Sequence, residues 1–202
     1  MDHITGLLSL REQKSLRLVC TNAVKHLLTR EFPLLPTLGK YCRIEHSTFP
    51  VRIAGIRISA LELETDKAPP YARRPARRGE VAGLRLEANH KRMVYLPGLP
   101  VINRAVEELV AGCDCLLVDG TFWSEREMIL LGLSKRTARD MGHVPISGVG
   151  GSLEWLRSLR IPRKIYTHIN NTNPILQKKS RERRMVEQAG VEISHDGMDI
   201  RL

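Results

Sequence analysis

The sequence contains few aromatic residues and no long apolar run. Phe, Trp and Tyr make up 4% of its 202 residues, so it offers no platform of rings on which nucleic-acid bases could stack. No stretch approaches the roughly 20 apolar residues that cross a bilayer, and the N-terminus lacks the basic-then-apolar order of a signal peptide. We therefore predict a cytoplasmic protein with no membrane span and no specific nucleic-acid partner.

Cysteine is also scarce, and acidic residues are outnumbered by basic ones. Cys113 and Cys115 stand two apart in a strand-like run, where their thiols would share one face instead of forming a Cys-x-x-Cys metal turn. Lys and Arg number 32 against 22 acidic residues, a net charge of +10, which attracts anionic partners. Much of this excess lies in two runs, Ala72–Arg78 and Lys178–Arg184, that we interpret as solvated loop and helix surface.

The apolar residues that are present suffice for a folded core. They form 42% of the chain, and helix-like and strand-like segments alternate along it, which favours a layered α/β protein. We expect helices over Ile4–Arg11, Ala23–Glu31 and Val101–Gly112, and strands over Leu16–Thr21 and up to Asp119.

Local signals predict several turns and element ends. Gly55 should turn a chain of alternating apolar residues, and LRLEAN with RMVYLPGLP should form a second hairpin. The Pro-rich segment Thr65–Gly83 should be an exposed loop. Ser124, with Glu127 three residues later, has the spacing of a capping box. A last β-hairpin should turn at Asp196-Gly197.

Ligand-type side chains stand at the ends of the apolar strands, where α/β proteins keep their sites. They are Asp2 and His3, Asp119 in LLVDGT, His143 in MGHVPISG and His168 in YTHINNTNP. Two histidines and one carboxylate around an ion with open positions suit zinc or non-haem iron. We therefore predict Asp2, His3 and His168 as metal ligands, with Asp119 and His143 as catalytic proton-transfer groups.

Each of these features has a purely structural alternative. A single Asp or His at a strand end is commonly a hydrogen-bond partner, and the asparagines of HINNTNP are typical of a turn. Because they follow the strand that carries His168, however, Asn170, Asn171 and Asn173 are also candidates for orienting its imidazole and for binding substrate.

The segments DHITGLLSLRE, YLPGL, CLLVDGTFW, MGHVPISGVGGSL, KIYTHINNTNPIL and HDGMDIRL resemble the pyrroloquinoline quinone (PQQ) biosynthesis protein B family along the whole chain. The resemblance implies a metallo-β-lactamase-like αββα four-layer sandwich, formed by residues 1–202 as a single domain. In that family a long region precedes the Asp-His pair, so we expect a domain that is incomplete at its N-terminus, through truncation or a misassigned start.

The resemblance further implies a role in PQQ biosynthesis. We expect iron-dependent hydroxylation of the tyrosine ring of a Glu-Tyr precursor, with molecular oxygen as co-substrate. The expected cofactor is a single ion, Fe(II) or Zn(II), the expected partners are other PQQ biosynthesis proteins, and the expected assembly is a homodimer. The segment Tyr95–Pro100, where related two-metal hydrolases carry an Asp, has no carboxylate. The alternatives are transport of PQQ or its precursor to the periplasm, a metal-dependent hydrolase, and an inactive basic fragment.

Overall fold

The computed structural model describes residues 2–69 and 71–202, with side chains from Ile4 onward. Its helices are α1 (Asp2–Thr5), α2 (Asn22–His26), α3 (Leu34–Leu38), α4 (Arg104–Val110), α5 (Glu127–Leu130), α6 (Ser152–Ser158) and α7 (Arg181–Gln188), with the 3-10 turns η1 (Gly6–Leu10), η3 (Arg139–Met141) and η4 (Pro174–Leu176) and the π-helical turn η2 (Leu27–Glu31). Its strands are β1 (Ser15–Val19), β2 (Arg43–Ser47), β3 (Val51–Ile53), β4 (Ile56–Glu62), β5 (Ala82–Ala88), β6 (Lys91–Leu96), β7 (Cys115–Asp119), β8 (Arg163–Thr167) and β9 (Glu192–Ile193).

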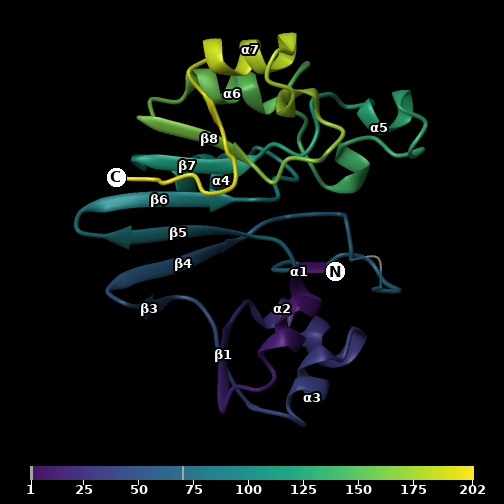
Figure 1. The fold of residues 1–202 in the computed structure, drawn as a ribbon, viewed down its shortest axis with the longest axis vertical. Helices are drawn as coiled ribbons and strands as arrows, with labels where there is room; N and C mark the ends of the chain where they lie inside the picture. Colours follow the sequence, from purple (N-terminus) through teal and green to yellow (C-terminus); the bar gives the residue numbers. More distant parts are fainter. Residues whose placement is uncertain (1, 70) are drawn as a thin grey trace.

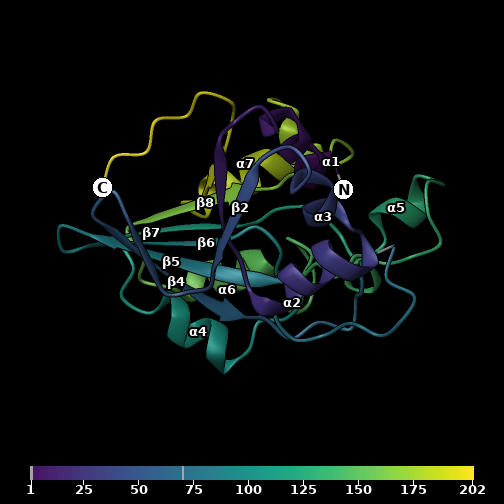
Figure 2. The same ribbon diagram turned by 90° about the horizontal axis from the view of Figure 1, so that it is seen from below.

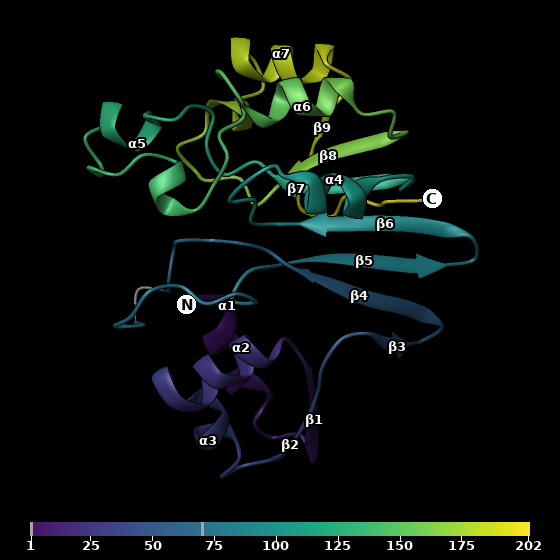
Figure 3. The ribbon, with the colours of Figure 1, turned by 180° about the vertical axis from the view of Figure 1, so that it is seen from behind.

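Strands β3 to β9 form one seven-stranded sheet whose spatial order follows the chain (Figure 1). Pairing is antiparallel from β3 to β6 and parallel from β6 to β9. Crossovers between neighbouring parallel strands are right-handed, which places the helices α4, α6 and α7 on the same face. Side chains of all three helices join one core cluster with the sheet, and Figure 3 shows α4 lying over β6 and β7.

The alternation of side chains along the parallel strands builds that core. On β6 and β7, Val94, Leu96, Leu116 and Val118 are fully buried beneath the helices. On β8 the ring of Tyr166 is also fully buried, and its hydroxyl lies 2.9 Å from the Ser152 hydroxyl at the start of α6. Burial of these apolar side chains fixes the register of the strands, since a shift by one residue would turn them to the opposite face.

The N-terminal residues form a smaller unit beyond the β3 and β4 edge of the sheet. Strands β1 and β2 pair in parallel and run across the direction of the large sheet's strands, with α2 and α3 beside them (Figures 1 and 2). The guanidinium of Arg74 ties this unit to the loop after β4, because it pairs with Glu31 of η2 at 2.8 Å and with Glu80 at 2.5 Å. The Thr65–Gly83 loop, expected to be exposed, therefore carries a partly buried ion-pair cluster.

Several local predictions are confirmed. The residues from Ile4 to Leu10 are helical, and β5 and β6 form the second predicted hairpin. The turn at Gly55 is present, with positive φ at both Ala54 and Gly55, as a two-residue hairpin turn of type I′ requires. Within the described residues, no helix combines the length and apolar character needed to span a bilayer.

Two local predictions are wrong. Ser124 does not cap a helix with its side chain: α5 begins at Glu127, and the Glu127 carboxylate instead accepts hydrogen bonds from Trp123 and Thr172. The chain does turn at Asp196-Gly197, but no strand follows, so the last hairpin is absent from the described residues. In both cases a longer-range contact is present: Thr172, one of the two donors to Glu127, comes from the loop after β8, and β9 pairs with β8.

We predict that Gly83→Ala destabilises the sheet. A Cβ at Gly83 would clash with Leu96 and come within 2.9 Å of Leu109 Cδ2, and overpacking of this kind costs about 1–3 kcal/mol. The control is Gly98→Ala, whose Cβ would lie 3.5 Å from Val81 Cγ1, an ordinary contact. Urea unfolding measures both variants, and equal free energies of unfolding would contradict the close packing at Gly83.

Candidate metal centre

The candidate site lies at the edge of the sheet where the parallel strands β7 and β8 end. Asp119 is the last residue of β7 and pairs with Thr167, so His168 follows directly beside it. The backbone of His168 takes a left-handed conformation with φ of 53°, which turns the chain away from the strand direction. Adjacent parallel strands thus bring a carboxylate and an imidazole to one place, as the sequence predicts.

The carboxylate of Asp119 is fully buried and connects three segments of the chain. Its Oδ2 accepts a hydrogen bond from the Leu99 backbone N–H at 2.9 Å, and its Oδ1 accepts from the Thr121 N–H at 3.0 Å and hydroxyl at 2.5 Å. His143 Nδ1 lies 2.6 Å from Oδ2. Because an ionised carboxylate only accepts hydrogen bonds, Nδ1 of His143 must carry the proton, which leaves Nε2 with a free lone pair.

His143 reaches this edge on the loop that precedes α6. The loop is held by backbone hydrogen bonds from Val144 N–H to the Leu99 carbonyl at 2.7 Å and from Ile146 N–H to the Phe122 carbonyl at 2.9 Å. The Phe122 ring also packs edge-on against the His143 imidazole, with ring centroids 5.7 Å apart. The position of His143 is therefore fixed by the same segments that surround Asp119.

His168 completes the cluster. Its ring stacks on that of His143 with centroids 5.6 Å apart, and its Nδ1 lies 2.9 Å from the Thr121 hydroxyl and 3.7 Å from Asp119 Oδ1. One ligand atom from each of Asp119, His143 and His168 lies within 4.8 Å of the other two. Two imidazoles and a carboxylate at this spacing form a donor set that fits zinc or iron.

Thr121 is a central residue of the site that the sequence analysis missed. Its hydroxyl contacts Asp119 and both histidines. It reaches them because Gly120 lets the chain pass close to β8: a Cβ at Gly120 would lie 3.0 Å from Tyr166 Cβ. The available signal was the Asp-Gly-Thr sequence at the end of a buried strand, in which Thr can hydrogen-bond to the preceding carboxylate.

The other predicted ligands, Asp2 and His3, lie in α1. Their side chains fall outside the part of the chain that the structure describes, so their role as metal ligands stays a prediction.

The three asparagines of the loop after β8 differ in their burial and hydrogen bonds. Asn173 is 1% exposed, and its amide donates to the Gly120 carbonyl at 2.9 Å and accepts from Ile175 N–H at 3.1 Å. Asn170 donates to the Thr172 hydroxyl at 2.6 Å, while Asn171 is exposed. The described hydrogen bonds to the His168 ring come from Thr121, so the expectation that asparagines orient that ring is wrong. Their substrate-binding role stays a prediction.

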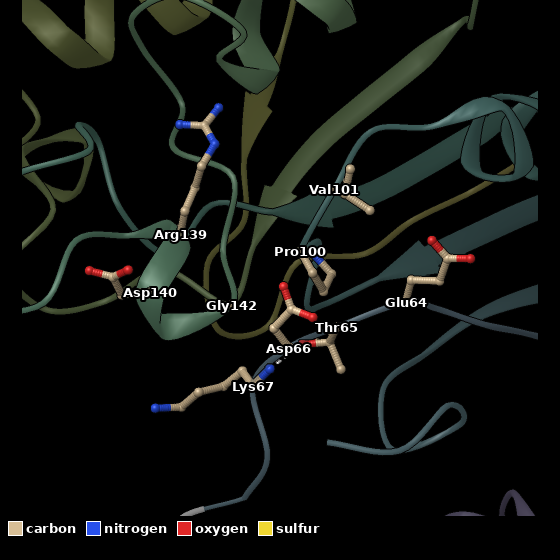
Figure 4. A pocket seen from close by; sticks show the side chains of 9 residues that line it. All are labelled: Glu64, Thr65, Asp66, Lys67, Pro100, Val101, Arg139, Asp140 and Gly142. Carbon is tan, nitrogen blue, oxygen red and sulfur yellow. Dashed lines mark hydrogen bonds between the residues drawn. The ribbon is translucent and has the colours of Figure 1, made fainter. Parts of the chain in front are cut away.

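Two pockets lie near the cluster. One, of about 610 Å³, is bordered by the segment 64–67 and by Pro100 and Gly142 (Figure 4). In that view the guanidinium of Arg139 points away from Pro100, and none of the three clustered residues lines the pocket. The other, of about 920 Å³, is lined by His168, so this pocket reaches one residue of the cluster.

The electrostatics of the cluster favour an ionised Asp119. Burial by itself raises the pKa of Asp119, but the hydrogen bonds from His143 and Thr121 and the nearby imidazole of His168 outweigh burial and bring the pKa below its usual value. The same carboxylate raises the pKa of His168, against the smaller opposing effect of burial. The cluster is therefore a buried anion that attracts positive charge, whether a proton on His168 or a metal ion.

Similarity to known proteins defines the superfamily and then the family of this chain. The model of a family described as "Beta-lactamase superfamily domain" matches residues 1–169, in agreement with the expected metallo-β-lactamase-like fold. Coenzyme PQQ synthesis protein B of Methylococcus capsulatus is 43% identical over 213 residues, covering 99% of this chain and 70% of that protein, and the protein of the same name from Nitrosococcus oceani is 43% identical over 218 residues with the same coverage. The chain belongs to the coenzyme PQQ synthesis protein B family, which confirms the resemblance seen in the sequence.

Solved structures agree with this assignment. The crystal structure of Zn(2+)-bound PqqB from Methylobacterium extorquens superposes with a TM-score of 0.88 at 29% identity, covering all of this chain and 70% of that one. The metallo-β-lactamase fold protein YhfI from Bacillus subtilis has a TM-score of 0.61 at 13% identity, covering 98% of this chain and 71% of that one. The second likeness shows the fold alone.

We predict opposite pH dependences for stability and metal affinity. Because the pKa of His168 is raised above 6.5, its protonated form stabilises the metal-free fold below that pH, and this contribution is lost as pH rises through the folded pKa. Asp119, with a lowered pKa, contributes above 3.8 and loses that contribution only in acid. Zinc affinity should rise with pH over the range where stability falls, because the neutral imidazole is the ligand.

The measurement is the Tm in chelator and the zinc Kd, each from about pH 5.5 to about pH 8.5. His168→Gln is the control, and the difference in Tm between this variant and the unmodified chain isolates the imidazole. A difference that does not change with pH would show that the Asp119–His168 interaction is negligible.

Proposed function

We propose that this chain acts in PQQ biosynthesis as a metal-dependent hydroxylase of the tyrosine ring in a Glu-Tyr precursor. The observation that carries the proposal is the convergence of Asp119, His143 and His168, with ligand atoms within 4.8 Å, at one edge of the sheet. It is supported by relatives 43% identical that are named for PQQ synthesis and by a zinc-bound structural neighbour.

Two ligand sets are compatible with this chemistry, and both contain His168. In one, Asp119, His143 and His168 hold the ion directly. In the other, the ligands are Asp2, His3 and His168, while Asp119 orients the His143 imidazole through Nδ1. A single Fe(II) ion with open coordination positions would supply the activation of molecular oxygen.

The chain's own residues would orient the substrate and move protons. Where Asp2, His3 and His168 hold the ion, Asp119 fixes the protonated Nδ1 of His143, so the lone pair of Nε2 is free to accept the proton of a phenol. The Thr121 hydroxyl, 2.9 Å from His168 Nδ1, sets the orientation of the second ring. Both imidazoles would therefore meet the substrate in a defined tautomer.

The segment Tyr95–Pro100 favours one ion over two. It borders the site, but its contribution is the Leu99 backbone N–H that binds Asp119, and its sequence contains no carboxylate. A single ion is less suited to the two-metal mechanism of related hydrolases. Hydrolysis of a phosphoester or lactone, transport of PQQ or its precursor, and an inactive basic fragment are the competing functions.

We predict that His168→Ala abolishes stoichiometric binding of zinc or iron, since both ligand sets require this imidazole. His90→Asn is the matched control, because His90 lies in the exposed turn between β5 and β6 with φ of 61°, a conformation that Asn tolerates. Metal content is measured by elemental analysis after dialysis. Retention of one tightly bound ion in His168→Ala would remove His168 from the site.

Two further variants distinguish the ligand sets. Loss of the ion in Asp2→Ala, with retention in Asp119→Asn, would assign the ligands to the N-terminal pair, whereas the reverse would assign them to the described cluster.

The reaction itself is tested with Glu-Tyr, iron, oxygen and an added two-electron reductant such as ascorbate, because insertion of one oxygen atom into the ring leaves the second atom of O2 to be reduced to water. We expect a hydroxylated tyrosine ring, identified by mass spectrometry as the gain of one oxygen atom, and loss of this product in His143→Ala. The control again is His90→Asn. Hydrolysis of a phosphodiester with zinc, in the absence of any hydroxylated dipeptide, would favour the hydrolase instead.

A further inference from the structure

The pocket of about 920 Å³ that contains His168 combines an apolar wall with separate charged groups. Its wall comes from the sheet, from the residue after His168 and from the C-terminal segment: Leu117, Ile169, Ile193, Met198 and Ile200. These side chains are buried or half-buried, so the wall is continuous with the protein interior. A flat apolar group of a ligand would be desolvated against this wall.

Two cations of the Lys178–Arg184 run line the same pocket. The sequence predicts solvated surface for this run, yet Lys178 and Arg183 face the pocket while Lys179, Arg181 and Arg184 do not line it. The run therefore divides into a pocket-facing pair and an outward-facing remainder, which its charge pattern alone does not show.

Arg183 is held in place before any ligand binds. Its Nε donates to Glu187 at 2.8 Å, one turn along α7, and one terminal nitrogen donates to the Ile175 carbonyl at 3.3 Å. The guanidinium has five N–H donors, so several remain for an anion. A preorganised guanidinium loses less side-chain entropy when it binds a carboxylate.

Asp196, in the turn after β9, adds a negative charge to the same pocket. Within the described residues its carboxylate has no ion-pair partner, and neither does the ammonium of Lys178. Cations on one segment and an anion on another are complementary to a zwitterion. A phosphate of nucleic acid fits less well, because Asp196 would repel it and the wall is apolar.

We propose that this pocket binds an amino-acid-derived substrate with an apolar ring: its carboxylate pairs with Lys178 and Arg183, and its ring lies on the apolar wall beside His168. This assignment rests on the proposed function, because it presumes that His168 belongs to the reacting centre. It goes further by naming the residues that select the substrate, which lie outside the metal cluster.

The test compares binding of two probes to zinc-loaded protein, where no oxidation occurs. One probe is the dipeptide Glu-Tyr, and the other is Gln-tyrosinamide, which has the same shape without carboxylates. Calorimetry on Lys178→Gln, and on the Lys178→Gln/Arg183→Gln double variant, measures the role of the pair. Lys179→Gln/Arg181→Gln is the matched control, since it removes the same charge from the same run outside the pocket.

We expect Glu-Tyr to bind about tenfold more tightly than Gln-tyrosinamide, the ratio that one charge-assisted hydrogen bond supplies. This preference should be lost in the double variant, reduced in Lys178→Gln and retained in the control. Lys178 is exposed, so its single variant remains informative if the double variant is poorly folded.

Three results would overturn the inference: equal affinity for both probes, no binding of Glu-Tyr, or an unchanged preference in the pocket variants. The experiment tests the pocket assignment separately from the proposed function, because calorimetry measures binding and requires no turnover. Carboxylate-dependent binding with no hydroxylated product would refute the hydroxylase and keep the pocket assignment. A hydroxylated product formed equally well by the pocket variants would refute the assignment and keep the hydroxylase.

Discussion

The candidate site depends on one buried carboxylate. A fully buried ion is costly unless every acceptor position is used, and Asp119 meets this condition by binding Leu99, Thr121 and His143, which come from three separate segments. The anion therefore determines more than its own position: the loop after β6, the turn after β7 and the loop before α6 all converge on it. Replacing it with an apolar side chain would leave donors from each segment without a partner.

The parallel strands of the fold bring these three segments together. Strands β6, β7 and β8 are parallel, so their carboxyl ends and the loops that follow them share one edge. The apolar residues of the same strands are packed beneath helices, which fixes the register and with it the height of Asp119 relative to His168. Packing on the helix-covered face thus controls the geometry of the site at the edge of the sheet.

The sequence was sufficient to predict strand ends but not the contacts between loops. Asp119 and His168 could be grouped because a buried strand followed by a ligand-type residue is a local pattern and parallel strands bring such residues together. The prediction that His143 also follows a strand is wrong: it follows the 3-10 turn η3, and backbone hydrogen bonds of its loop bring it to the site. The contacts of Thr121 with His168 and of Glu127 with Thr172 could not be predicted, since these partners stand more than 40 residues apart in the chain. The capping-box spacing failed for the same reason: tertiary hydrogen bonds to Glu127 outweighed a local preference.

The charge pattern of the sequence also does not show which basic residues line a pocket. A basic run is usually solvated, but two cations of Lys178–Arg184 line the pocket beside His168: Lys178, which precedes α7, and Arg183 in its first turn. Net charge describes long-range attraction of anions, whereas selection among anions requires cations fixed near an apolar surface. In this chain His168 belongs both to the anion-centred cluster and to the cation-bearing pocket. A carboxylated substrate drawn to Lys178 and Arg183 is thereby held outside the buried negative charge of Asp119, and its uncharged ring is the part that can approach the histidines.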